Sequence, residues 1–252
     1  MKSVIAEALV KTYDKGNVKA LDNLNLDVEE GTVLGVLGPN GAGKTTTVRI
    51  LSTLLRPDSG RATVAGIDVI KNPDKVREII GLSGQYAAVD EILTGYDNLV
   101  MFGQLYHLGK KQSIVRANEL LERFSLTDAA KRPIKNYSGG MRRRLDLAAS
   151  LIVKPKVLFL DEPTTGLDPR GRQEMWGVIQ ELVKGGRELV RKTVVVLGVE
   201  THQFHEFANA CLLTVLVQGL LDADGGTDAL PDAVPRIQTG VRVLEYELDV
   251  AT

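Results

Sequence analysis

The chain has 252 residues, 44% hydrophobic and 25% charged, which excludes a disordered chain and suits one large domain or one and a half. Its charges nearly cancel, with 31 Lys and Arg against 32 Asp and Glu, so nothing in the net charge favours a nucleic-acid partner and none is expected. The single cysteine, Cys211, lies in an apolar run and is expected to be a small buried core residue. No run reaches the roughly 18 apolar residues of a membrane span, and the first residues lack the apolar region of a signal peptide. We therefore expect a cytoplasmic protein that reaches a membrane only through a partner.

Apolar runs and turn residues predict an α/β fold. Two alternating segments flank the turn-like sequence at residues 14–17 and predict an antiparallel β layer at the N-terminus. The segment from about 88 to 150 has apolar residues at helix spacing and predicts a helical subdomain. Elsewhere strands alternate with helices, which is typical of a mainly parallel sheet. The predicted strands cover residues 4–10, 21–28, 33–37, 61–64, 67–70, 79–83, 156–160, 193–197, 212–217 and 241–250. A helix at 45–55, a turn at 57–60 and a helix at 142–153 are also predicted.

A phosphate-loop pattern, G-x-x-x-x-G-K-[ST], occupies residues 38–45. It follows a predicted buried strand and opens a predicted helix, a context that favours a nucleotide site over an ordinary Gly-rich turn. Its glycines allow the tight turn that points backbone N–H groups at phosphate, and the helix adds its positive N-terminal end. Lys44 would reach the β- and γ-phosphates, and the Thr45 hydroxyl would ligate Mg²⁺. The predicted phosphate-binding residues are Gly38, Pro39, Asn40, Gly41, Ala42, Gly43, Lys44, Thr45 and Thr46.

Two adjacent carboxylates, Asp161 and Glu162, follow the predicted strand at 156–160. We expect this strand to lie beside the phosphate-loop strand, because ligands gather at the carboxyl ends of parallel strands. Asp161 could then hold Mg²⁺ through water, and Glu162 could accept a proton from a water that attacks the γ-phosphate. The competing interpretation is a simple helix-start pair before Pro163. The phosphate loop upstream favours the catalytic interpretation.

A second helix start that could bind an anion occurs at Ser138-Gly139-Gly140, where Ser138 is a suitable N-cap and the glycines expose N–H groups. One nucleotide cannot easily use two such sites, and by itself the segment is better interpreted as a capped helix. The following Arg142-Arg143-Arg144 is expected to be a solvated face without a site role.

Taken in order, these motifs resemble the ATP-binding cassette family, the nucleotide-binding subunits of ABC transporters. The resemblance rests on the phosphate loop, Gln85 after a short apolar strand, the Ser138-Gly139-Gly140 signature, the Asp161-Glu162 pair and the loop Gly166-Leu167-Asp168. It covers residues 1–184 well and the remainder poorly. The sequences at 84–90 and 137–145 look like the daunorubicin-resistance type of exporter subunit, including Met141 where the usual signature has Gln.

The resemblance implies an α/β fold of the P-loop NTPase type and a homodimer of cassettes paired head to tail. Ser138, Gly139 and Gly140 would contact the γ-phosphate of ATP bound to Lys44 of a second copy, which would explain the two anion sites. Tyr13 would stack on adenine, and Asp168 would shape the dimer contact. Gln85 would sense Mg²⁺ and the γ-phosphate and connect to the helical subdomain, where a permease on a separate chain docks.

The family's switch residue has no clear match. Its usual spacing after Asp168 falls on Val194, inside a predicted strand, so His202, Gln203 or neither could serve, with His202 our first choice for a catalytic role. We expect an ATP-binding domain at 1–225, with a helical subdomain at about 88–150. The tail at 226–252 could begin an accessory domain.

The expected function is that of a Mg²⁺-dependent ATPase subunit at the inner face of the cell membrane, powering export of a hydrophobic or drug-like compound. Two alternatives stay open: a nucleotide-gated binding module with weak hydrolysis, and a soluble cassette ATPase outside transport. The sequence does not identify the compound, the permease or the direction of transport.

Overall fold

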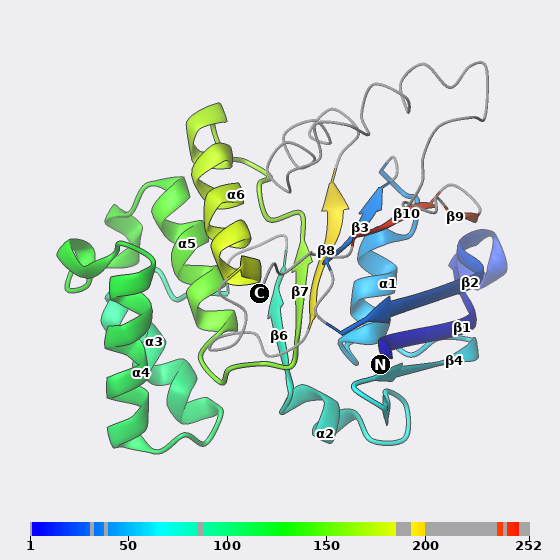
Figure 1. The fold of residues 1–252 in the computed structure, drawn as a ribbon, viewed down its shortest axis with the longest axis horizontal. Coiled ribbons are helices and arrows are strands. Elements are labelled where there is room, and N and C mark those ends of the chain that lie inside the picture. Colours follow the sequence, from blue (N-terminus) through cyan, green and yellow to red (C-terminus); the bar gives the residue numbers. More distant parts are fainter. Residues whose placement is uncertain are drawn as a thin grey trace.

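The structure is a computed structural model that describes residues 2–30, 33–37, 40–84, 88–184, 193–199, 236–238 and 241–246. It contains a parallel-rich sheet, an antiparallel sheet and a group of helices (Figure 1). The strands are β1 (Lys2–Tyr13), β2 (Val18–Glu29), β3 (Val33–Leu37), β4 (Ser59–Val64), β5 (Ile67–Asp68), β6 (Ile80–Ser83), β7 (Val157–Asp161), β8 (Thr193–Val199), β9 (Arg236–Gln238) and β10 (Val241–Tyr246). The helices are α1 (Lys44–Leu51), α2 (Pro73–Arg77), α3 (Gly95–Leu105), α4 (Lys110–Arg123), α5 (Gly139–Ser150) and α6 (Pro169–Lys184). Short 3-10 turns occur at Asp14–Gly16, Thr127–Ala129 and Ile134–Asn136.

The larger sheet has the strand order β6-β7-β8-β3-β10-β9. The strands β6, β7, β8 and β3 are mutually parallel, and β10 runs antiparallel to β3 and β9. The mainly parallel sheet is therefore confirmed. The predicted adjacency of the Asp161 strand and the phosphate-loop strand is wrong, because β8 lies between β7 and β3 and pairs with both. The apolar run of β8 suits this central position, since a strand covered on both faces carries no polar alternation.

The smaller sheet is the antiparallel β layer that the alternation predicts, in the order β2-β1-β4-β5. Its long strands extend beyond the predicted segments, and β4 begins at Ser59, within the predicted turn at 57–60. The first helix ends earlier than predicted, at Leu51 rather than at residue 55. It ends there because Thr53 adopts a left-handed backbone with φ 67°, and the N–H groups of Leu54 and Leu55 both return to the carbonyl of Arg49.

Helix α1 packs between the two sheets, α5 and α6 lie on the other side of the parallel sheet, and α3 and α4 pack against α5 on its outer side (Figure 1). The first core cluster joins the antiparallel sheet to α1 and to the near face of the parallel sheet; its members include Leu9, Leu26, Leu34, Val48, Ile50, Val64 and Phe159. The second cluster joins α3, α4, α5 and α6 to the far face; its members include Leu99, Leu120, Phe124, Leu145, Leu158 and Ile179. Residues 88–150 form helices α3 to α5 and contain no strand, as predicted.

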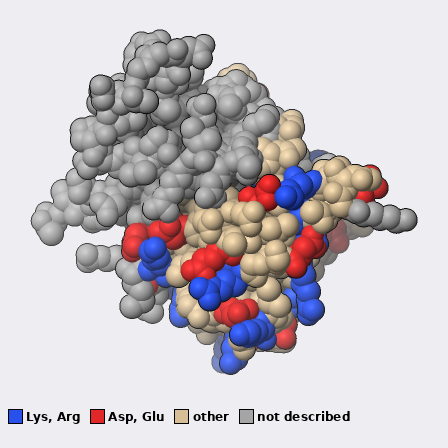
Figure 2. Space-filling model, turned by 90° about the vertical axis from the view of Figure 1, so that its right-hand side faces the viewer, with Lys and Arg blue, Asp and Glu red and all other residues tan. Residues whose placement is uncertain are grey.

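Basic and acidic side chains alternate over the described part of the face shown in Figure 2. Ion pairs tie β1 to its surroundings: Lys2 Nζ lies 2.9 Å from Asp27 Oδ2 of β2, Arg61 of β4 pairs with Glu7, and Lys11 Nζ lies 2.7 Å from Asp58 Oδ1 in the turn before β4. Each exposed ion pair of this kind contributes little to the stability of the fold. Among the helices that the structure describes, none combines the length and the apolarity that crossing a membrane requires.

Candidate functional site

The structure describes residues 40–45 of the phosphate-loop motif; residues 40–43 lead directly into α1, which begins at Lys44. Gly41 and Gly43 have φ values of 87° and 88°, in the left-handed region that glycine adopts without steric cost. Gly43 is the N-cap of α1 and is buried against β2, where a Cβ would overlap the carbonyl oxygen of Ala20. The next residue, Lys44, is only 4% exposed. The sequence therefore folds into an exposed tip followed by a buried lysine at a helix start, the arrangement that a phosphate group requires.

A side-chain contact joins this helix start to the end of β7. The Thr45 hydroxyl donates to Asp161 Oδ1 at 3.1 Å, across a separation of 116 residues in sequence. Burial raises the pKa of Asp161, and the neighbouring Glu162 raises it further, while the Thr45 hydrogen bond, Arg49 and Lys44 oppose the rise. These two oxygens fit Mg²⁺, which proteins hold through one or two carboxylates and the phosphates of the substrate. Thr45 and Asp161 would hold the ion, and its chemistry there is to neutralise phosphate charge.

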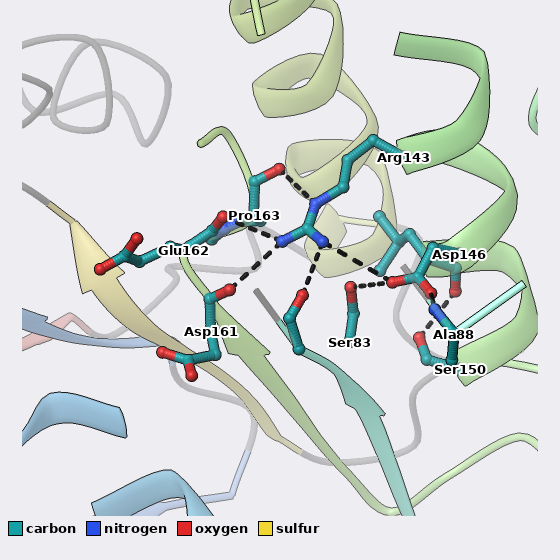
Figure 3. A network of polar contacts seen from close by, with 10 residues as sticks. Ser83, Ala88, Arg143, Asp146, Ser150, Asp161, Glu162 and Pro163 are labelled. Atoms are coloured by element: carbon teal, nitrogen blue, oxygen red, sulfur yellow. Dashed lines mark hydrogen bonds and ion pairs between the residues drawn. The ribbon is translucent and has the colours of Figure 1, made fainter. Parts of the chain in front are cut away.

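The neighbouring carboxylate, Glu162, has an unusual backbone. Its φ of 50° is in the left-handed region, which costs a non-glycine residue about 1–3 kcal/mol and is tolerated where the surroundings hold it. Its Oε2 accepts a hydrogen bond of 3.0 Å from the Thr165 hydroxyl, and its carbonyl accepts from the Thr165 N–H at 3.1 Å. Figure 3 shows the Glu162 carboxylate pointing away from the buried polar network around Arg143.

Arg143 contradicts the prediction that Arg142-Arg143-Arg144 is a solvated face. It is 6% exposed and donates hydrogen bonds to four backbone carbonyls at the ends of β6 and β7 (Figure 3). Burial lowers its pKa and the nearby carboxylates oppose this, but a guanidinium stays protonated. The prediction is wrong because α5 turns this residue toward strand ends whose carbonyls need donors. Asp146, one turn later in an otherwise apolar stretch, is the sequence signal that could have identified it.

The other two arginines of the run also have partners. Arg142 is half-buried and its Nη1 lies 2.8 Å from Glu91 Oε1, and Arg144 Nη1 lies 3.5 Å from the carbonyl oxygen of Phe124. These contacts fix the helix to its own subdomain and do not reach the phosphate loop.

The Ser138-Gly139-Gly140 signature lies at the start of α5. Ser138 is the N-cap, as predicted, and its Oγ accepts from the Met141 N–H at 3.2 Å. Ser138 and Gly139 are exposed, and a Cβ at Gly140 would meet no described atom within 4 Å. Since α5 and α1 pack on opposite faces of the parallel sheet, the signature and the phosphate loop are not parts of one pocket within the chain (Figure 1).

Of the remaining predicted residues, the structure describes Tyr13 and Asp168. Tyr13 is 38% exposed and its hydroxyl lies 3.5 Å from the Thr46 hydroxyl, which places it at the start of α1. Asp168 caps α6, where its Oδ1 accepts from the Gly171 N–H at 3.2 Å. Several other predictions lie outside the described residues: Gly38, Pro39, Gln85, His202, Gln203, Cys211 and the strand at 212–217.

Comparisons with known proteins identify the family. Residues 21–165 match the family model described as ABC transporter. The daunorubicin resistance ATP-binding protein DrrA2 of Streptomyces coeruleorubidus is 58% identical over 234 residues, covering 92% of this chain and 69% of that protein. The doxorubicin resistance ATP-binding protein DrrA of Mycobacterium tuberculosis is 47% identical over 230 residues, covering 90% of this chain and 67% of that protein.

The fold is also similar to that of a known ATP-binding cassette. The dimeric post-hydrolysis structure of the ATP-binding cassette MJ0796, bound to ADP and Pi, has a TM-score of 0.68 at 27% identity, covering 80% of this chain and 89% of that one. The phosphate loop, the Asp161-Glu162 pair and the capped signature thus occur in a chain whose sequence and fold both match cassettes. The chain therefore belongs to the ABC transporter family, as an ATP-binding subunit of the daunorubicin-resistance type.

Proposed function

We propose that the chain is the ATP-hydrolysing subunit of an ABC exporter, and that it powers export of a hydrophobic or drug-like compound through a permease on a separate chain. The observation that carries the proposal is the contact between Thr45 and Asp161, which joins the phosphate-loop helix to the strand that ends at Glu162. The class of exported compound is taken from the names of the relatives.

The nucleotide would lie over the exposed tip of the phosphate loop. Lys44 neutralises charge on the β- and γ-phosphates, and the N–H groups at the start of α1 donate to the phosphate oxygens. Tyr13, beside Thr46, supplies a ring on which adenine can stack. Thr45 and Asp161 would hold Mg²⁺, and Gln85 is proposed as a further ligand.

Glu162 acts on water. As a carboxylate next to Asp161, it can orient a water and accept its proton as the oxygen attacks the γ-phosphate. In this structure its Oε2 is bonded to the Thr165 hydroxyl, a contact that a water could replace. His202 or Gln203 would complete the site as the switch residue.

The complete site needs a second copy of the chain. Ser138 and Gly139 are exposed, Gly140 is partly exposed, and their helix α5 lies on the opposite face of the sheet from α1, so the three residues are available to the γ-phosphate bound by a partner. Asp168, at the start of α6, would contribute to the contact between the two copies. The membrane location follows from the permease, which carries the translocation path.

The test is the replacement Glu162→Gln. We expect the variant to bind ATP with near-normal affinity and to form an ATP-dependent dimer, while hydrolysis falls roughly 10²–10⁴-fold, the usual value of a positioned base. Glu174→Gln is the matched control, because Glu174 is exposed on α6 and, within the described part of the chain, pairs with Arg170 and not with a predicted site residue. Phosphate release and size-exclusion chromatography with ATP are the measurements.

Two outcomes would change the conclusion. Near-normal turnover in Glu162→Gln would show that another group orients the water. Tight ATP binding by the unmodified chain without phosphate release, even with its permease, would favour the nucleotide-gated binding module. Copurification from membranes would identify the permease.

A further inference from the structure

Arg143 and Asp146 form a buried polar pair in α5 that none of the roles described above uses (Figure 3). Both side chains are nearly inaccessible, at 6% and 4% exposed, and they are one helical turn apart. Their closest charged atoms are 3.8 Å apart, and the hydrogen bonds of both groups go to other residues. Burying a charged group lowers the stability of the fold unless hydrogen-bond partners compensate for the lost water. The partners of Arg143 and Asp146 therefore show which segments the pair holds.

The guanidinium of Arg143 spans the turn that contains Glu162. Its Nε donates to the Pro163 carbonyl at 2.8 Å, and its Nη2 donates to the carbonyls of Glu162 and Asp161 at 2.9 and 3.2 Å. These three consecutive carbonyls surround the left-handed backbone of Glu162. Arg143 thus holds the backbone on both sides of Glu162, from which the proposed base projects.

The same pair holds both ends of the segment that follows β6. Arg143 Nη1 donates to the Gly84 carbonyl at 2.6 Å. Asp146 Oδ2 accepts from the Ser83 hydroxyl at 2.6 Å, and Asp146 Oδ1 accepts from the Ala88 N–H at 2.7 Å. The bonded residues lie immediately before and after residues 85–87, which include Gln85.

We propose that Arg143 and Asp146 are positioning residues that couple the signature helix to the catalytic turn at Glu162 and to the ends of the Gln85 segment. The inference rests on the proposed function of Glu162 and Gln85. The signature that contacts the partner's nucleotide begins α5, and Arg143 and Asp146 project from the first two turns of the same helix. A shift of α5 on dimer closure therefore moves four carbonyls and one N–H that belong to the hydrolytic site and its neighbouring segment.

The chemistry of the pair explains why arginine is needed. A guanidinium presents five N–H donors in a rigid plane and can hold several carbonyls in fixed relative positions. A lysine at the same place keeps the charge but has three donors on a flexible stem, so it would neutralise the site without fixing the geometry. Arg143→Lys consequently separates positioning from charge.

The chain offers a matched control in Arg116. Arg116 is also 6% exposed and also donates to backbone carbonyls, with Nη2 2.9 Å from the Leu151 oxygen and Nε 3.3 Å from the Ile152 oxygen. It joins α4 to the residues after α5 and has no bond to the turn at Glu162. Arg116→Lys thus reproduces the loss of a buried guanidinium that has no hydrogen bond to the segments of the proposed coupling.

The experiment compares unmodified protein, Arg143→Lys, Arg116→Lys and Glu162→Gln in one ATPase assay with the copurified permease. We expect Arg143→Lys to lower kcat about 10- to 100-fold, the effect of a small misplacement of a catalytic group, with KM and nucleotide affinity changed less than about twofold. Arg116→Lys should have the kcat of the unmodified protein, even though its thermal midpoint should fall about as much as that of Arg143→Lys. Equal effects of the two lysine variants would overturn the proposal and assign Arg143 to folding alone.

A second readout does not require hydrolysis. Amide hydrogen exchange should rise at residues 83–88 and 161–165 in Arg143→Lys but not in Arg116→Lys, and Asp146→Asn should raise it chiefly at 83–88, because the new amide nitrogen cannot accept a bond. Asp146→Asn also serves if Arg143→Lys fails to fold. Unchanged exchange in both segments would overturn the proposal.

The two proposals fail in different ways. An inactive unmodified protein would contradict the proposed function and leave the exchange result to decide the coupling. An active protein with an inactive Glu162→Gln and a normal Arg143→Lys would contradict the positioning role alone.

Discussion

The replacement Gly43→Ala should be much more damaging than the same replacement two residues earlier in the phosphate loop. Gly41 and Gly43 have nearly identical backbones, with φ of 87° and 88°. Their surroundings differ: a Cβ at Gly41 would meet no described atom within 4 Å, whereas at Gly43 it would overlap the Ala20 carbonyl and lie 2.8 Å from Leu21 Cδ2. The two positions therefore separate backbone strain from steric overlap.

The magnitudes follow from these two contributions. A left-handed alanine costs about 1–2 kcal/mol, which is the whole expected loss of unfolding free energy for Gly41→Ala. Gly43→Ala adds about 1–3 kcal/mol for displacing a backbone carbonyl in a packed region, so its loss should be about 2–5 kcal/mol. For a chain of this size each kcal/mol lowers the thermal midpoint by about 2–4 °C.

Thermal melting without nucleotide measures the difference directly. Gly43→Ala should melt about 4–20 °C below the unmodified protein, and Gly41→Ala about 2–8 °C below it. Gly43→Ala should also weaken binding of a fluorescent ATP analogue, because a shift at the N-cap moves Lys44. Equal thermal midpoints for the two variants would refute the reasoning, since the packing against Ala20 would then carry no cost.

Two further predictions concern the dimer and the antiparallel sheet. Mixing Lys44→Ala with Ser138→Arg protein should rebuild about one competent site per heterodimer, so phosphate release should exceed that of either variant alone; merely additive activity would place the signature's role within its own subunit. The hydrogen bond from Lys11, helped by two bonds from Thr12, lowers the pKa of Asp58 to about 2 from 3.8. A carboxylate whose pKa is lower in the folded state stabilises the fold at pH values above its unfolded-state pKa, and this stabilisation is lost as the pH falls through the folded-state pKa. The urea midpoint of Asp58→Asn should therefore lie below that of the unmodified protein by the full amount above about pH 4, and the difference should shrink toward pH 2. A deficit independent of pH would contradict this assignment.

Local patterns in the sequence were sufficient for the parts of the site that one chain segment builds. The phosphate loop is predictable because its glycines, lysine and threonine act through the backbone and helix start that they themselves form. The Ser138 cap and the antiparallel sheet are predictable for the same reason: a cap bonds within its own first turn, and alternation with period two reports a half-buried strand. Family membership follows from the order of these motifs along the chain.

The tertiary structure alone decided the relations between segments. Alternation and apolar content indicate that β7, β8 and β3 are buried strands, but not that β8 separates the other two, because pairing energy depends on partners distant in sequence. The arginine run itself does not reveal that Arg143 is buried, since it has the same letters whether it faces water or four backbone carbonyls; the one sequence signal is Asp146 in the apolar stretch that follows. The contact between Glu162 and Thr165 is local, but the left-handed backbone of Glu162 lies between carbonyls that Arg143 bonds from a helix distant in sequence. The sequence determined which groups we propose for the chemistry, because each belongs to a local motif, and non-local packing decided how Asp161 and Arg143 are held.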